Sequence, residues 1–287
     1  MPIRWHQEDP VLFEAAIRLT AGETGFPPRL IEKDYFCSVL LEHLAARCDT
    51  LIFKGGTCLA KVHAGFHRLS EDLDFSIPVT RAVGRANRSR CVDPLRDVVR
   101  EITAVLPAFR VIEPLTGSNQ STQYNAVLGY SSRVGDPEII KVDVGLREPT
   151  VTATHEGPAR TVLLNPLSRQ EMVAPFAVPC LSYPEAMAEK LRAALCRRDA
   201  AIRDFFDVDH AVQQGGFDAV AADIIDLVRV KLAVQGTGAV DVSQDRLAQL
   251  RRQLDSELRP VVHPVAFEQF DLDRAFDSVR AVAGRLG

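Results

Sequence analysis

The chain has 287 residues, of which 46% are hydrophobic and 25% are charged. This balance is typical of a globular protein and excludes a disordered or fibrous one. The length suffices for one or two domains with a core that needs no disulfide or structural metal. Lysine and arginine number 34 against 38 acidic residues, a net charge of −4, so a nucleic-acid site would have to be a local basic patch.

The cysteines are scattered along the chain, and no two have the CxxC spacing of a zinc ribbon. They are Cys37, Cys48, Cys58, Cys91, Cys180 and Cys196. This spacing predicts reduced thiols rather than disulfides. The sequence shows neither a signal peptide nor an apolar stretch near the ~18 residues of a membrane span. We therefore expect a cytoplasmic protein with no membrane partner.

Apolar periodicity and turn residues predict a mixture of helices and short strands in the first part of the chain. The apolar run at 51–53, bounded by two glycines, is typical of a buried strand. Five prolines make residues 148–180 irregular in this prediction. Helices are expected over 11–21, from Pro27–Pro28 through Leu44, over 57–63 and over 87–106, and strands over 51–53, 73–77, 109–115, 124–130 and 139–146.

From Pro184 onward the pattern becomes helical to the end. The change near residue 180 predicts a boundary between a mixed domain, 1–180, and a helical domain, 181–287. The expected helices of the second domain cover 184–198, 201–213, 217–234, 243–257 and 267–284.

A glycine pair follows the first predicted strand, in the order Phe53-Lys54-Gly55-Gly56-Thr57. Glycines let a backbone approach a phosphate closely, and amides at a helix start attract anions. The spacing is not that of a Walker A loop. A glycine pair before a helix is also typical of a plain tight turn, so both interpretations stay open.

Three aspartates form the clearest chemical pattern. Asp72 and Asp74 are two residues apart on a predicted strand and would point to one face. Two like charges there are costly unless a cation lies between them, and Mg²⁺ prefers such hard oxygen ligands. Asp143, in a later strand, would complete a two-metal site for phosphoryl transfer. The alternative is a pair of solvated carboxylates on an edge strand.

Together these segments make the chain resemble the DNA polymerase β-like nucleotidyltransferases, and more closely the AbiEii/AbiGii family of nucleotidyltransferase toxins from bacterial abortive-infection and type IV toxin–antitoxin loci. The resemblance lies in the order of the segments over residues 31 to about 210; the remaining helices match only in general character. The segments are 31–35 (IEKDY), 53–57 (FKGGT), 68–75 (RLSEDLDF), 141–143 (KVD), 189–193 (EKLRA) and 203–207 (RDFFD).

The resemblance implies an α+β fold, with a polymerase β-like core of mixed sheet and flanking helices, and a C-terminal helical bundle that closes the nucleotide cleft. It implies that Asp72, Asp74 and Asp143 hold Mg²⁺ or Mn²⁺, with Asp143 also near the attacking hydroxyl as a base. The family's loop, here Gly55, Gly56 and Thr57, would cradle the triphosphate of an NTP, and Ser70 would touch the phosphates.

The resemblance also implies roles for three residues of the helical domain. Lys190 would reach the triphosphate as a point charge. Asp204 and Asp207 match the family's DxxD signature and share one helix face, where they would orient Lys190 or an arginine, or help to bind the nucleotide. The alternative is that Lys190 is a surface ion-pair partner of nearby acidic residues, a contact worth only ~0–1 kcal/mol.

Two further patterns are weighed against structural alternatives. His63 and His67 have the i, i+4 spacing of some zinc sites. The HExxH glutamate is missing and Gly65 is expected to end the helix, so no zinc is expected there. Cys58 is interpreted as a packed cysteine. Arginines are dense over 81–100, where they would follow an RNA backbone or form a helix with salt bridges to Asp93, Asp97 and Glu101. Further arginines could extend this basic surface: Arg147, Arg197, Arg198 and Arg203.

The sequence therefore predicts a metal-dependent nucleotidyltransferase that moves a nucleoside monophosphate from an NTP to an acceptor hydroxyl. By resemblance, the acceptor is the tRNA 3′ end, whose blocking stops translation, and the partner is a cognate antitoxin protein. Two alternatives remain at this point: a protein or small-molecule acceptor, and a nucleotide-binding module without catalysis.

Overall fold

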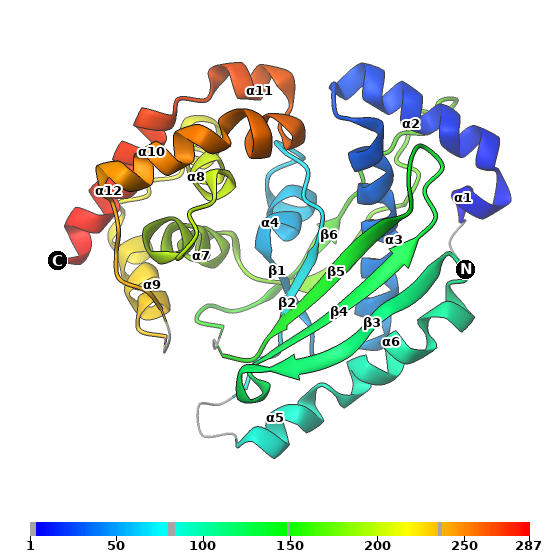
Figure 1. The fold of residues 1–287 in the computed structure, drawn as a ribbon, viewed down its shortest axis with the longest axis horizontal. Coiled ribbons are helices and arrows are strands. Elements are labelled where there is room, and N and C mark those ends of the chain that lie inside the picture. Colours follow the sequence, from blue (N-terminus) through cyan, green and yellow to red (C-terminus); the bar gives the residue numbers. More distant parts are fainter. Residues whose placement is uncertain (1–3, 80–83, 148–149, 235–236) are drawn as a thin grey trace. The chain divides into compact units, whose positions relative to one another are not determined.

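The computed structural model describes residues 4–79, 84–147, 150–234 and 237–287 (Figure 1). The chain divides into two compact units. Unit 1 comprises the described residues of 1–150 and 154–181, and unit 2 comprises 151–153 and those of 182–287. No helix among the described residues is long and apolar enough to cross a membrane. The predicted closure of the helical domain over the nucleotide stays a prediction.

A seven-stranded mixed sheet forms the centre of unit 1, in the order β3-β4-β5-β2-β1-β7-β6. Strand β2 is parallel to β5, and β1 is parallel to β7, while the other neighbours are antiparallel. The strands are β1 (Ile52–Lys54), β2 (Leu73–Ser76), β3 (Phe109–Ser118), β4 (Gln123–Tyr130), β5 (Glu138–Gly145), β6 (His155–Ala159) and β7 (Phe176–Cys180). With its flanking helices, this sheet confirms the predicted α+β class.

Helices pack against this sheet and against each other (Figure 1). Helix α3 contacts β5 and β7, α6 contacts β3, and α2 packs on α3. The Asp9 carboxylate caps α2 by accepting from the Leu12 amide at 2.9 Å, which satisfies one of the unpaired amides of the first turn. The helical elements are α1 (Trp5–Glu8), α2 (Pro10–Thr24), α3 (Pro28–Arg47), α4 (Gly55–Cys58), the π-helical turn η1 (Leu59–His63), α5 (Arg85–Cys91), α6 (Asp93–Val105) and the 3₁₀ turn η2 (Asn119–Ser121).

The core of unit 1 combines aromatic packing with one buried ion pair. Phe36 stacks on Tyr130 with ring centroids 4.1 Å apart. Elsewhere in this core, the buried Lys61 ammonium pairs with the Asp34 carboxylate, which also accepts from the Thr161 hydroxyl at 2.8 Å. Breaking a buried pair of this kind leaves an uncompensated charge and costs about 3–5 kcal/mol. Asp34 is therefore a structural residue of α3.

In the part of unit 2 that the structure describes, all the regular elements are helices. Helix α7 packs on α8, α9 and α12, and the Phe205 and Phe276 rings stack with centroids 5.9 Å apart. The elements are α7 (Tyr183–Cys196), α8 (Ile202–Gly215), α9 (Ala222–Leu232), α10 (Gln244–Gln253), the π-helical turn η3 (Leu254–Leu258), the 3₁₀ turn η4 (Arg259–Val261), α11 (Pro264–Gln269) and α12 (Leu272–Leu286).

Three element predictions were wrong. Residues 148–180 are not all irregular, because they contain β6 and β7; β6 is an edge strand, where its proline at 158 is tolerated. The single helix expected over 87–106 is two helices, because Pro94 cannot continue a helix and instead lies in the first turn of α6. The last expected helix, 267–284, is divided between α11 and α12.

Candidate active site

Two of the predicted metal ligands are direct neighbours in the sheet. Strands β2 and β5 run parallel, and their register pairs Asp74 with Asp143. The residues on either side of Asp74, Leu73 and Phe75, are 0% and 1% exposed, so their side chains fill the core. Because side chains alternate along a strand, the two aspartates share the opposite face. The pattern of apolar residues around each aspartate thus determines where both carboxylates point.

The third carboxylate lies one residue before β2. Asp72 Oδ1 accepts a hydrogen bond from the Lys141 amide at 3.3 Å, which ties it to β5. Burial, and after it the negative charge of Asp72, raise the pKa of Asp143. The Asn125 amide nitrogen, in the orientation that satisfies both its polar atoms, donates to Asp143 Oδ1 at 2.6 Å. These contacts hold three negative groups near one another in a partly buried site.

This donor set fits a divalent cation. Carboxylate oxygens are the ligands that Mg²⁺ prefers, and a cation would offset the repulsion that raises the pKa of Asp143.

The glycine pair lies directly against these carboxylates. Gly55 has a φ of +76°, and a Cβ there would lie 2.8 Å from Asp74 Cγ, closer than real contacts allow. A Cβ at Gly56 would lie 2.5 Å from Arg68 Nη2 and 3.1 Å from Ser70 Oγ. Gly55 therefore requires glycine for its backbone and its close approach to Asp74, whereas a Cβ at Gly56 would displace the Arg68 guanidinium.

Thr57 connects the loop to the metal ligands in another way. Its hydroxyl donates to the Asp72 carbonyl, and its side chain is buried. The hydroxyl is thus occupied inside the protein, and the part of Thr57 left to meet a ligand is its backbone amide. The Ser70 hydroxyl lies close to Gly56, as the order of the loop and the aspartates in the sequence suggested.

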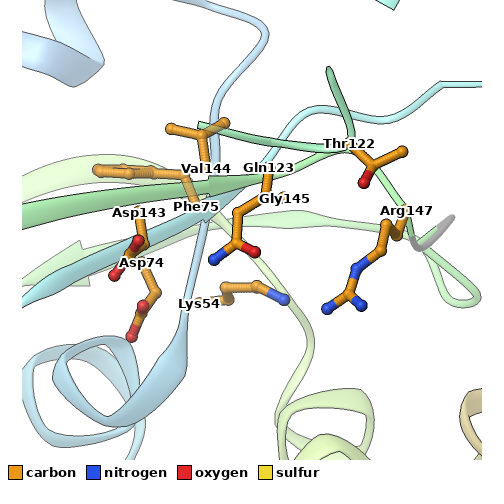
Figure 2. A pocket seen from close by; sticks show the side chains of 9 residues that line it. All are labelled: Lys54, Asp74, Phe75, Thr122, Gln123, Asp143, Val144, Gly145 and Arg147. Atoms are coloured by element: carbon orange, nitrogen blue, oxygen red, sulfur yellow. The ribbon is translucent and has the colours of Figure 1, made fainter. Parts of the chain in front are cut away.

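A pocket of about 180 Å³ opens beside Asp74 and Asp143. Figure 2 shows the two carboxylates at one end of it, and the Lys54 ammonium and the Arg147 guanidinium at the other. Gln123 lies between them in this view. A pocket with acidic ligands at one end and fixed cations at the other has the charge pattern needed for a metal-bound, phosphate-bearing substrate.

Lys54 and Gln123 were not singled out from the sequence, and Arg147 was named only as part of a basic surface. The sequence contains only weak signals for these pocket residues. Lys54 is the last residue before the glycine pair, and the registers that bring Gln123 opposite Gly145 and Asn125 opposite Asp143 form only in the folded sheet. Sheet pairing between distant segments, rather than any local motif, assembles this pocket.

The predicted residues of the helical domain form a cluster within unit 2. The Lys190 ammonium lies 2.8 Å from Asp204 Oδ1 and 2.9 Å from Asp207 Oδ2. The side chain of Lys190 is 13% exposed, and those of the two aspartates 6% and 0%. The i, i+3 pair on α8 thus holds Lys190 of α7, which is one of the roles expected for the DxxD signature. Lys190 is not an exposed surface ion pair.

The arginine-rich segment is partly neutralised by its own acidic residues. Arg96 pairs with Asp93, and Arg100 pairs with Asp97 at 2.6 Å. Arg96 also lies over the Tyr124 ring, 5.4 Å from its centroid. For these two arginines the salt-bridged alternative holds, whereas RNA binding by the segment stays a prediction. Residues 81–83, including Arg81, lie outside the described residues.

Comparisons with known proteins identify the family of this chain. A family model described as "Nucleotidyl transferase AbiEii toxin, Type IV TA system" matches residues 39–281. The chain belongs to this family, so it is a nucleotidyltransferase toxin of a type IV toxin–antitoxin system, with an NTP as substrate and an antitoxin as partner.

One solved structure has a similar fold along most of the chain. The fold is similar to that of MenT4, a nucleotidyltransferase toxin from Mycobacterium tuberculosis H37Rv, with a TM-score of 0.57 and 18% identity over 94% of this chain and 97% of that chain. No curated protein sequence matches the chain.

Proposed function

We propose that this nucleotidyltransferase is metal-dependent and transfers a nucleoside monophosphate from an NTP to the 3′ end of tRNA, releasing pyrophosphate. The observation that carries the proposal is the register that pairs Asp74 with Asp143 beside the Gly55 turn. This arrangement combines three hard oxygen ligands with a loop that a phosphate can approach closely. The toxin would act in the cytoplasm, where its acceptor and its antitoxin are found.

Asp72, Asp74 and Asp143 would hold Mg²⁺ or Mn²⁺. Such ions, when bound, polarise phosphate oxygens and offset the charge that develops on the leaving pyrophosphate. Asp143 would also accept the proton of the attacking hydroxyl, since it lies in the pocket next to Asp74. Its hydrogen bond from Asn125 would fix the carboxylate orientation during that step.

The triphosphate would be bound by backbone and by charge. The Gly55, Gly56 and Thr57 amides would approach it, and the Ser70 hydroxyl, which lies against Gly56, would add a donor. Lys54 and Arg147 line the same pocket and would offset the negative charge of the phosphates.

Lys190 would add a further positive charge to the triphosphate. It belongs to unit 2, where Asp204 and Asp207 fix the position of its ammonium. Three cations and a set of amides are the usual means of stabilising transferred phosphoryl groups, because little covalent chemistry is left to the protein.

The proposed acceptor rests on the family resemblance and on the cations of the pocket. A tRNA whose 3′ end carries an added nucleotide can no longer be aminoacylated, which accounts for toxicity. Arg147 is exposed at the edge of the pocket, where an RNA phosphate can reach it. A protein or small-molecule acceptor is the competing outcome.

The acceptor is tested with purified protein, Mg²⁺, each α-labelled NTP in turn and total tRNA. A matched sample contains the same tRNA after periodate oxidation, which converts the terminal ribose diol to a dialdehyde and removes the attacking hydroxyl. We expect label in intact tRNA with at least one NTP and none in oxidised tRNA. Label that survives ribonuclease but not protease would overturn tRNA as acceptor. No transfer to any acceptor would overturn metal-dependent transfer by this site.

A further inference from the structure

Four ligand-type side chains from four different elements meet at one place in unit 1. Cys58 is the last residue of α4, His63 the last of η1, Cys180 the last of β7 and His155 the first of β6. Both cysteines are 0% exposed, His63 is half-buried and His155 is exposed. None of the four lines the pocket beside Asp74. The cluster is therefore separate from the proposed nucleotide site.

The distances within the cluster suit a tetrahedral metal site. Cys58, His63 and Cys180 each offer a ligand atom within 4.8 Å of the others, and no other such group of three is found among the described residues. His155 Nε2 lies 3.6 Å from Cys180 Sγ. With Zn–S near ~2.3 Å and Zn–N near ~2.0 Å, tetrahedral geometry separates sulfur and nitrogen ligands by about 3.5 Å.

The orientation of His63 matches that of a metal ligand. Its Nε2 lies 3.0 Å from the Leu181 carbonyl and donates to it. A carbonyl oxygen only accepts, so Nε2 carries a proton in this contact. Histidines that bind metals almost always donate their other ring nitrogen to a carbonyl or carboxylate in this way.

Backbone pairing and a glycine hold the other ligands in place. His155 and Cys180 are register partners in the β6–β7 pair, and the His63 and His155 ring centroids are 5.5 Å apart. A Cβ at Gly157 would collide with the Val62 side chain and lie 3.1 Å from Cys180 Sγ, so glycine lets these groups pack closely.

We propose that Cys58, His63, Cys180 and His155 bind one zinc ion in a closed, structural site. Two thiolates and two imidazoles are a common ligand set for structural zinc. The i, i+4 pair of His63 and His67 is not the basis of this site, because Gly65 and Phe66 have positive φ and end the helical turn between them.

The position of the site gives it a structural consequence for the phosphate loop. Cys58 directly follows Thr57, whose hydroxyl is bonded to the Asp72 carbonyl. Cys180 lies beside Phe53 of β1, and the Leu181 amide donates to the Phe53 carbonyl at 3.1 Å. Zinc would thus tie both ends of the segment 53–58, which contains the glycine pair, to the β6–β7 edge of the sheet.

The test uses the full chain, purified under reducing conditions and analysed for bound metal after gel filtration. We expect about one zinc per chain in the wild type and in the control variant Cys48→Ala. Cys48 is a buried cysteine at the end of α3 and lies outside the cluster. Less than a fifth of that zinc should remain in Cys58→Ala and Cys180→Ala. Asp74→Asn should retain full zinc, which separates this site from the carboxylates.

A second measurement needs no variant to fold. Cobalt(II) added to the reduced, metal-free wild type should give thiolate-to-metal charge-transfer bands and the intense visible bands of tetrahedral coordination. Zinc should abolish these bands and protect two of the six cysteines from a thiol reagent. Absence of thiolate bands together with unchanged thiol reactivity in zinc would overturn the proposal. A disulfide between Cys58 and Cys180, found in protein that has been treated with a reductant and with zinc, would overturn the proposal as well.

Discussion

The approach of Gly55 to Asp74 gives the sharpest single perturbation of the proposed nucleotide site. In Gly55→Ala the new methyl group would lie 2.8 Å from Asp74 Cγ and 2.9 Å from its Cβ. The carboxylate must move by the better part of an ångström to restore ordinary contact. A displacement of about 1 Å at a reacting group can cost about 10²-fold in rate. We expect at least that loss of nucleotide transfer.

The same substitution also carries a backbone cost, because Gly55 has a φ of +76°. A non-glycine residue in this region costs about 1–2 kcal/mol. Gly216→Ala is the matched control, since Gly216 has a φ of +62° at the end of α8 and no atom within 4 Å of an added Cβ. Both variants should lose similar stability in urea unfolding.

Only Gly55→Ala should lose activity, measured as the initial rate of label transfer from an NTP at saturating Mg²⁺. A Gly55→Ala variant within about threefold of the Gly216→Ala rate would refute the reasoning, because the contact with Asp74 would then have no catalytic consequence.

Three further predictions follow from charges in the structure. Asp143→Asn should raise the melting temperature slightly without Mg²⁺, because it removes repulsion from Asp72. It should also abolish the rise in melting temperature that Mg²⁺ is expected to cause in the wild type. An equal rise in the variant and the wild type would contradict this prediction. Lys190→Met removes the ion-pair partner that two buried carboxylates share and should destabilise unit 2 by about 3–5 kcal/mol. Arg197→Met, which removes an exposed partner of Asp204, should cost under ~1 kcal/mol. Equal losses of protection from hydrogen exchange in the two variants would argue against a buried pair. Burial lowers the pKa of His6 from 6.5 to about 4, so the unfolded state binds more protons and stability falls as the pH drops from about 6.5 to about 4. The loss between pH 7 and pH 5 is about 2 kcal/mol, measured by fluorescence of the single tryptophan Trp5, and His6→Gln should not show it.

Local sequence signals predicted much of unit 1. The apolar run ending at Phe53, the glycine pair and the alternation around Asp74 each act over a few residues, and each formed the element expected from it. Pro158 of β6 was misleading, because a proline is allowed at a sheet edge, and edge position is a property of the whole sheet.

The candidate sites were predictable to different degrees for the same reason. Asp72 and Asp74 form a local motif, whereas the pairing of Asp74 with Asp143 depends on the parallel β2–β5 contact across nearly seventy residues. The cysteine–histidine cluster has no sequence motif, since Cys58 and Cys180 are brought together by the β1–β7 pair. Side chains assembled by distant pairing of strands leave no spacing for a sequence pattern to detect.

The central claim is that the paired carboxylates of β2 and β5 carry out metal-dependent nucleotide transfer to tRNA. The most direct measurement is label transfer from α-labelled NTP to tRNA by the wild type, by Asp74→Asn and by Asp226→Asn, a surface carboxylate paired with Arg229, each with Mg²⁺ and with excess chelator. We predict transfer by the wild type and Asp226→Asn in Mg²⁺ only, and a loss of at least about 10³-fold in Asp74→Asn. Transfer by Asp74→Asn at the wild-type rate, or transfer unaffected by the chelator, would contradict the claim.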